Sequence, residues 1–155
     1  MNIKNGITEQ QKHLVNEQRL PEQPLQERLE KVERELSTWE NKEAWVLAIF
    51  MRETGIRLMD ALELRPEHIN NEEVSMVERK MAPRLYEYHN GRKPTISPKT
   101  VKLLAAGDDG KYFHITAEQF RFALRKASLK QNLGKEEYVR AYDFRRYYME
   151  RSRVV

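Results

Sequence analysis

The sequence contains no cysteine and no long apolar run, and these two absences exclude several kinds of protein. Without cysteine, neither a disulfide framework nor a thiolate metal site can form. No stretch of about 18 apolar residues is present, so no transmembrane helix is expected. The first 22 residues are rich in Gln, Asn and Glu and lack the apolar segment of a signal peptide. We therefore expect a cytoplasmic protein with no membrane partner.

The sequence also lacks the motifs of several enzymes that use cofactors or an activated serine. It has no phosphate-binding loop, no glycine-rich dinucleotide fingerprint and no serine-hydrolase elbow. Its four histidines, which are scattered without the spacing of metal ligands, are His13, His68, His89 and His114. We therefore expect no metal and no small-molecule cofactor.

Charge is abundant and slightly unbalanced in this chain of 155 residues. Charged residues make up 34% of it, the net charge is +4 and the pI is about 9.3. This excess is a mild bias toward anionic partners such as nucleic acids. The length fits one domain with an appended arm. We predict a polar flexible arm over residues 1–24, which contain Pro21 and Pro24, and a core over residues 25–155.

Helical periodicity dominates the core. Residues 25–37 carry leucine and valine at helical spacing, which predicts a leading amphipathic helix. Residues 39–53 are apolar nearly all round and predict a central buried helix, with Ser37 and Glu40 as a capping box. Thr116 and Gln119 form a second capping box before an apolar stripe. Further helices are expected over residues 58–64, 98–106 and from 141 onward.

The middle of the chain has the alternating pattern of strands. Strands are expected over residues 73–79, 84–89 and 94–96, with Asn90 and Gly91 suited to a tight turn. The order of elements therefore predicts an α+β fold that is mainly helical. It contains a small three-stranded antiparallel sheet packed against helices.

Basic residues stand at three separated and structured positions. Arg57 directly follows the buried helix, and Asp60 lies three residues on, where it can orient Arg57. Lys80 ends a strand beside the hairpin, and Arg145 lies early in the last helix. Two guanidinium groups and an ammonium group can converge on one phosphodiester, since the arginine fork matches two phosphate oxygens and lysine can protonate a leaving oxygen.

The local context of these residues resembles the tyrosine recombinases, the phage-type integrases. Residues 53–69 resemble the first signature block of that family: Thr54, Gly55, Arg57, Leu64 and Ile69 match it, and the acidic position of the block is filled by Asp60. Residues 140–146 resemble the block that contains the second arginine. The resemblance runs in order from about residue 39 to residue 149 and implies the catalytic-domain fold of that family.

The resemblance also implies roles. Arg57 and Arg145 would clamp the scissile phosphate, and Lys80 would be the general acid, with Lys93 as the alternative lysine. Asp60 would support Arg57. Family chemistry breaks and rejoins DNA strands through a tyrosine–phosphate ester without metal or ATP. The expected function is site-specific DNA recombination and integration for a phage or mobile element, with double-stranded DNA and other copies of the chain as partners.

The chain departs from the family pattern at three places, one of which is the absence of the family's later histidine or tryptophan. Tyr142 occupies the position of a histidine, and a phenol donates a hydrogen bond but is a poor base near neutral pH. The segment that normally carries the nucleophilic tyrosine is absent, and Tyr147 and Tyr148 lie close to Arg145 instead. We therefore expect this chain alone to be inactive in cleavage. It is either a shortened catalytic core or a naturally short relative.

Further basic residues flank these positions and are expected to contact DNA phosphates. The expected DNA-contacting residues are Arg79, Arg84, Arg92, Lys99, Arg121, Arg125 and Arg146.

Two other interpretations of the chain remain open. In the first, it is a DNA-binding or regulatory module that does not cut DNA. In the second, it is a small helical interaction protein.

Overall fold

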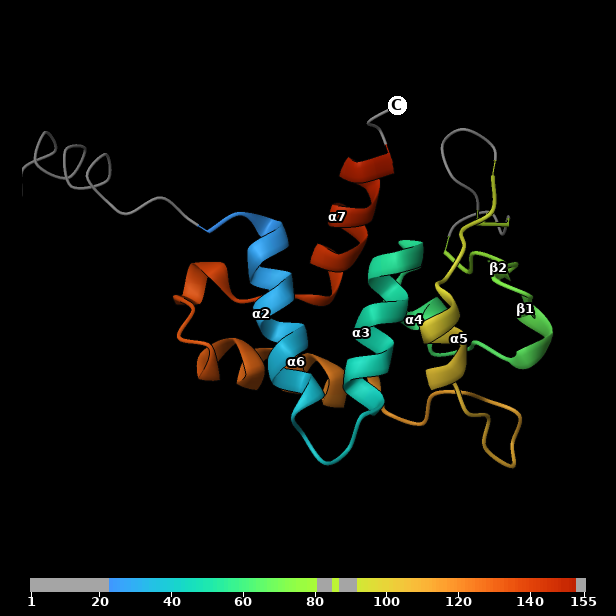
Figure 1. The fold of residues 1–155 in the computed structure, drawn as a ribbon, viewed down its shortest axis with the longest axis horizontal. Coiled ribbons are helices and arrows are strands. Elements are labelled where there is room, and N and C mark those ends of the chain that lie inside the picture. The colour runs from blue at the N-terminus through green and yellow to red at the C-terminus, as the bar shows by residue number, and fades with distance from the viewer. Residues whose placement is uncertain (1–22, 81–84, 87–91, 153–155) are drawn as a thin grey trace, which may run out of the picture.

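Helices make up most of the structure, a computed structural model that describes residues 23–80, 85–86 and 92–152. A small antiparallel sheet lies beyond α4 and α5, at one side of the helices (Figure 1). The mainly helical α+β fold is confirmed. The helices are α2 (Leu25–Ser37), α3 (Glu43–Thr54), α4 (Leu58–Ala61), α5 (Pro98–Leu103), α6 (Ala117–Lys130) and α7 (Ala141–Ser152), with 3-10 turns η2 (Pro66–His68) and η3 (Lys135–Glu137). The strands are β1 (Ile69–Asn70) and β2 (Glu73–Val74).

Helix α3 forms the centre of the core, as its apolar sequence predicts. Its residues Leu47, Ala48 and Phe50 are fully buried. The helix packs against α2, α4, α5 and α7, and Figure 1 shows it between α2 and α5. Each large apolar side chain that is fully buried contributes about 1.5–3 kcal/mol. This packing gives a rigid base for the chain segments that leave the C-terminal end of α3.

The sheet is smaller than predicted. Its regular part, within the described residues, has two strands rather than three, with Ile69 opposite Val74. The expected third strand, residues 94–96, contacts β2 only through an isolated bridge between Glu73 and Thr95. Pro94 has no N–H to donate, so the pairing cannot continue as a regular ladder at that residue. Most of the expected strand 84–89 lies outside the described residues.

One of the two predicted capping boxes is confirmed. The Gln119 N–H donates to Thr116 Oγ1 at 3.1 Å, and the Thr116 N–H donates to Gln119 Oε1 at 2.9 Å. The box predicted at Ser37 is wrong, because α2 continues to Ser37 and the serine hydroxyl donates to a carbonyl oxygen within α2. Helix α3 begins later, where Asn41 Oδ1 accepts from the Glu43 N–H at 2.9 Å.

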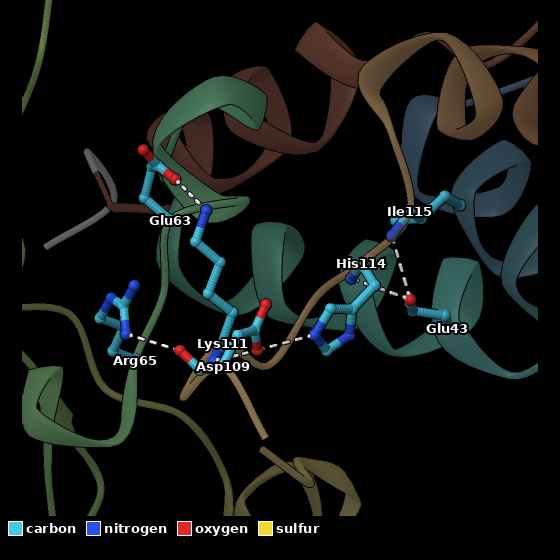
Figure 2. A network of polar contacts seen from close by, with 7 residues as sticks. All are labelled: Glu43, Glu63, Arg65, Asp109, Lys111, His114 and Ile115. Atoms are coloured by element: carbon cyan, nitrogen blue, oxygen red, sulfur yellow. Dashed lines mark hydrogen bonds and ion pairs between the residues drawn. The ribbon is translucent and has the colours of Figure 1, made fainter. Parts of the chain in front are cut away.

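A polar network fastens the long loop between α5 and α6 to the helices (Figure 2). The Glu43 carboxylate, at the start of α3, accepts the backbone N–H groups of His114 and Ile115 at 3.0 and 3.1 Å. Lys111 Nζ donates to Glu63 at 3.1 Å. His114 Nε2 lies 2.9 Å from Asp109 Oδ1, and this hydrogen bond raises the pKa of His114 above its usual value.

Glu43→Ala will lower the free energy of unfolding by about 1–3 kcal/mol, because two backbone N–H groups lose a charged acceptor. Urea unfolding followed by circular dichroism measures this change. Glu40→Ala is the matched control, since Glu40 is exposed and its removal is expected to change stability by less than about 0.5 kcal/mol. Equal unfolding midpoints for the two variants would contradict the role of Glu43.

Candidate nucleic-acid interface

A hollow of about 1040 Å³ opens between α4, α6 and the first turns of α7. Met51 of α3 and the segment around residue 80 complete its wall. Among its lining residues the only carboxylate is Asp60, which is buried. The hollow therefore has a strongly positive surface and suits an anionic ligand. Its basic lining residues are Arg57, Arg79, Lys80, Arg121, Arg125, Arg140 and Arg145.

The turn that ends α3 determines the position of Arg57. Gly55 adopts a φ of 72° and closes the helix with a hydrogen bond from its N–H to the Met51 carbonyl oxygen at 2.8 Å. Arg57 then has extended backbone and is the N-cap residue that precedes α4. Its guanidinium forms an ion pair with the buried carboxylate of Glu78 and keeps 34% of its side chain exposed. The exposed part of Arg57 lines the hollow.

Asp60 has a different partner from the one expected. Its Oδ2 accepts from the Tyr86 hydroxyl at 2.5 Å, and its Oδ1 accepts from the Arg79 N–H at 3.3 Å. The carboxylate that contacts the Arg57 guanidinium is that of Glu78. The spacing of three residues does not pair Arg57 with Asp60, because Arg57 precedes α4 with extended backbone and is not part of its helical face.

Tyr86 contacts both predicted arginines, although its sequence context did not mark it as a functional residue. Only 6% of its surface is exposed. Its hydroxyl donates to Asp60 and also accepts from the Arg57 N–H at 3.3 Å. Burial, together with the hydrogen bond to Asp60, raises the pKa of Tyr86 to about 12. The only signal in the sequence was its place in an alternating strand pattern, which indicates burial but no partner.

Arg145 reaches the same place from α7. Its Nη1 donates to the Gly55 carbonyl oxygen at 2.6 Å, and its guanidinium carbon lies 5.8 Å from the centre of the Tyr86 ring. Arg57 and Arg145 therefore meet around one short segment and one tyrosine, although they are far apart in the sequence. Both line the hollow, as does Lys80.

The tyrosines near Arg145 divide between two hollows. Tyr142 lines the basic hollow and is 64% exposed. Tyr147 and Tyr148 line a separate hollow with both acidic and basic residues. The Tyr147 hydroxyl accepts from Arg151 Nη1 at 2.5 Å. Tyr142 is therefore placed to meet a ligand held by Arg145, and Tyr147 and Tyr148 lie on the other side.

The remaining predicted DNA contacts fall into two groups. Arg79, Arg121 and Arg125 line the hollow, and so does Arg140, which was not predicted as a DNA contact. Arg84 lies outside the described residues. The other predicted DNA contacts do not line the hollow: Lys99 Nζ lies 5.8 Å from the Trp45 ring centre, Arg146 Nη2 lies 3.5 Å from Asp143 Oδ1, and Arg92 is exposed elsewhere. The alternative catalytic lysine, Lys93, also lies outside the hollow, with its Nζ 4.0 Å from Glu73 Oε1.

Within the described ranges, no three His, Asp or Glu side chains gather in a way that could hold a metal ion. None of the helices described there is long and apolar enough to cross a bilayer.

No protein-family model and no curated protein sequence matches this chain. Solved structures do. The catalytic domain of bacteriophage HP1 integrase matches with a TM-score of 0.59 and 16% identity, over 84% of this chain and 70% of that chain. XerA recombinase matches with a TM-score of 0.59 and 11% identity, over 84% of this chain and 49% of that one. XerH site-specific recombinase, bound to its difH substrate, matches with a TM-score of 0.58 and 15% identity, over 84% and 43%.

These likenesses establish the fold. The chain has the catalytic-domain fold of the tyrosine recombinases and integrases, as its motifs predicted. It spans less than half the length of the two recombinases, XerA and XerH. At sequence identities of 11–16%, these matches establish the fold alone, and the activity of the chain has to be argued from the site itself.

Proposed function

We propose that this chain binds double-stranded DNA in the basic hollow and acts in site-specific recombination or integration as a phosphate-gripping catalytic core. One observation carries the proposal. The residues singled out from separate segments, Arg57, Lys80, Tyr142 and Arg145, line the same hollow. These residues come from three segments that lie between positions 57 and 145, and nothing local brings the three segments together, so their meeting is best explained by a shared ligand.

The chemistry of the lining fits a phosphodiester. Arg57 and Arg145 offer planar forks to the non-bridging oxygens, where negative charge grows in the transition state. Lys80 is the candidate proton donor to the leaving 5′-oxygen, and it is preferred over Lys93 because Lys93 lies outside the hollow. Tyr142 can donate a hydrogen bond to the phosphate. A histidine at that position would also accept a proton, which a neutral phenol does poorly.

The hollow is wider than one phosphate group. Arg121 and Arg125 project from α6, and Arg140 precedes α7, so all three lie on the wall that α6 and α7 form. We assign these arginines to phosphates that flank the gripped one along the same duplex. Assembly of several copies on paired DNA sites, which the family resemblance implies, is part of the proposal.

A second candidate function is DNA binding without cleavage. The observation in its favour is that Tyr147 and Tyr148 line a different hollow from Arg57 and Arg145. A nicked duplex that traps covalent intermediates separates the two functions. A covalent protein–DNA adduct, formed by this chain or by a form extended to carry the nucleophilic tyrosine, supports the catalytic core. Intact binding without an adduct in both forms supports the binding module.

Duplex DNA binding is expected to weaken steeply with salt, because each neutralised phosphate contributes about 0.9 to the slope of log K against log salt. Fluorescence anisotropy at several salt concentrations measures this slope. The double variant Arg121→Ala/Arg125→Ala will reduce the slope by about 2. The control Lys93→Ala/Lys99→Ala removes the same charge outside the hollow and will leave the slope nearly unchanged. Equal slopes for the two double variants would show that binding is not centred on the hollow.

A further inference from the structure

We infer that Tyr86 is a positioning residue that fixes the two phosphate-binding arginines, Arg57 and Arg145, relative to each other. The inference rests on the proposed function, and it goes further by assigning a role to a residue that does not line the hollow. Tyr86 is buried, so it cannot itself contact DNA. Its effect on binding must therefore pass through the groups that it contacts.

The hydroxyl of Tyr86 fixes the start of α4. It accepts from the Arg57 N–H at 3.3 Å and donates to Asp60 Oδ2 at 2.5 Å. Helix α4 has only four residues, and its first N–H groups have no partners within the helix. A phenol that bridges Arg57 and Asp60 therefore sets the direction in which the Arg57 side chain leaves the backbone.

The ring of Tyr86 supports the second arginine. The Arg145 guanidinium lies 5.8 Å from the ring centre, and its Nη1 donates to the Gly55 carbonyl oxygen at 2.6 Å. A cation beside an aromatic face is attracted to the ring, and more strongly so when both are shielded from water. One side chain thus contacts Arg57 through its hydroxyl and Arg145 through its ring.

Tyr86 also ties this pair of arginines to the segment that carries Lys80. Its backbone N–H donates to the Met76 carbonyl oxygen at 3.0 Å, and an antiparallel bridge joins Val77 to Leu85. Lys80 follows Val77 by three residues. The same residue therefore connects the three segments that supply Arg57, Arg145 and Lys80.

The protonation of Tyr86 agrees with this role. Because its pKa is raised to about 12, the phenol stays neutral and keeps its proton for Asp60 throughout the pH range in which DNA binding is measured. An ionised phenolate would lose the donor and repel the Asp60 carboxylate.

The test uses the whole chain and a fluorescent duplex at fixed low salt. Tyr86→Phe removes the hydroxyl and keeps the ring, and we expect DNA affinity to fall about five- to tenfold, as for loss of one ordinary hydrogen bond. Added to Arg57→Ala, the same change should weaken binding little further, because the hydroxyl acts through Arg57. Tyr112→Phe is the matched control, since Tyr112 is partly buried and lies outside the hollow.

A spectroscopic readout separates positioning from general loss of structure. In NMR spectra the Hε of Arg145 should carry a ring-current shift that Tyr86→Phe retains and Tyr86→Leu loses. Asp60→Asn alters the hydrogen bond of the Tyr86 hydroxyl from the acceptor side, because it keeps the shape of the acceptor and removes its charge. If both changes act on the same hydrogen bond, Asp60→Asn will change binding less in the Tyr86→Phe background than in the unaltered chain.

The outcomes distinguish this inference from the proposed function. If Arg57→Ala and Arg145→Ala weaken DNA binding while Tyr86→Phe does not, the inference is overturned and the proposed function stands. Full additivity of Tyr86→Phe with Arg57→Ala overturns it as well. If the unaltered chain binds no DNA, the proposed function fails and the inference fails with it.

Discussion

Gly55→Ala will destabilise the fold by about 2–5 kcal/mol, the largest effect that we expect from a single small substitution. Gly55 has a φ of 72°, a left-handed conformation that costs a residue with a side chain about 1–2 kcal/mol. A Cβ at this position would also lie 2.7 Å from Cγ of the Tyr148 ring. The ring belongs to α7, so relief of the clash would require α3 and α7 to move apart.

Thermal unfolding measures the Gly55→Ala effect. For a chain of this length, each kcal/mol lowers Tm by about 2–4 °C, so a fall of roughly 10 °C is expected. Gly134→Ala is the matched control. Gly134 has a φ of −69°, and an added Cβ would meet its nearest neighbour at 3.6 Å, an ordinary contact. Its Tm should stay unchanged or rise slightly, since alanine restricts the unfolded chain. Similar Tm losses for both variants would refute the close approach at Gly55.

The second large effect concerns DNA affinity. Arg57→Ala and Arg145→Ala will each weaken duplex binding by about 10- to 100-fold, which corresponds to the loss of a hydrogen-bonded charge worth about 1.5–3 kcal/mol. Arg145→Lys will not restore binding, because an ammonium group cannot donate to the Gly55 carbonyl and to two phosphate oxygens with the geometry of a planar fork.

Arg146→Ala provides the control for Arg145→Ala. It removes the same charge from the next residue of α7, but Arg146 lies 3.5 Å from Asp143 and does not line the hollow. Its effect on the dissociation constant should be less than about threefold, as for an exposed ion pair. If both variants weaken binding equally, binding follows the overall charge of the chain and the hollow has no special role.

Part of the site was readable from the sequence because its signals are local. Arg57 follows a buried apolar helix and a glycine, and Arg145 lies early in a helix, so both were placed at element boundaries. The structure brings both to one hollow. Arg140 was not predicted to contact DNA, although it begins the block of residues 140–146, because the resemblance assigns a role to Arg145 and none to the first residue of the block. Tyr86 was missed because a strand tyrosine shows burial in its pattern but not the groups that it meets.

The sequence by itself determined the helices of the core and the presence of basic residues at their ends. Periodicity and the Thr116 cap depend on neighbours within one or two turns, so the chain carries that information locally. Only the tertiary structure decided that Glu78 rather than Asp60 contacts Arg57, and that Lys80 rather than Lys93 lines the hollow. These outcomes depend on contacts between residues far apart in the sequence, which form only when α3, α7 and the strand segments pack together.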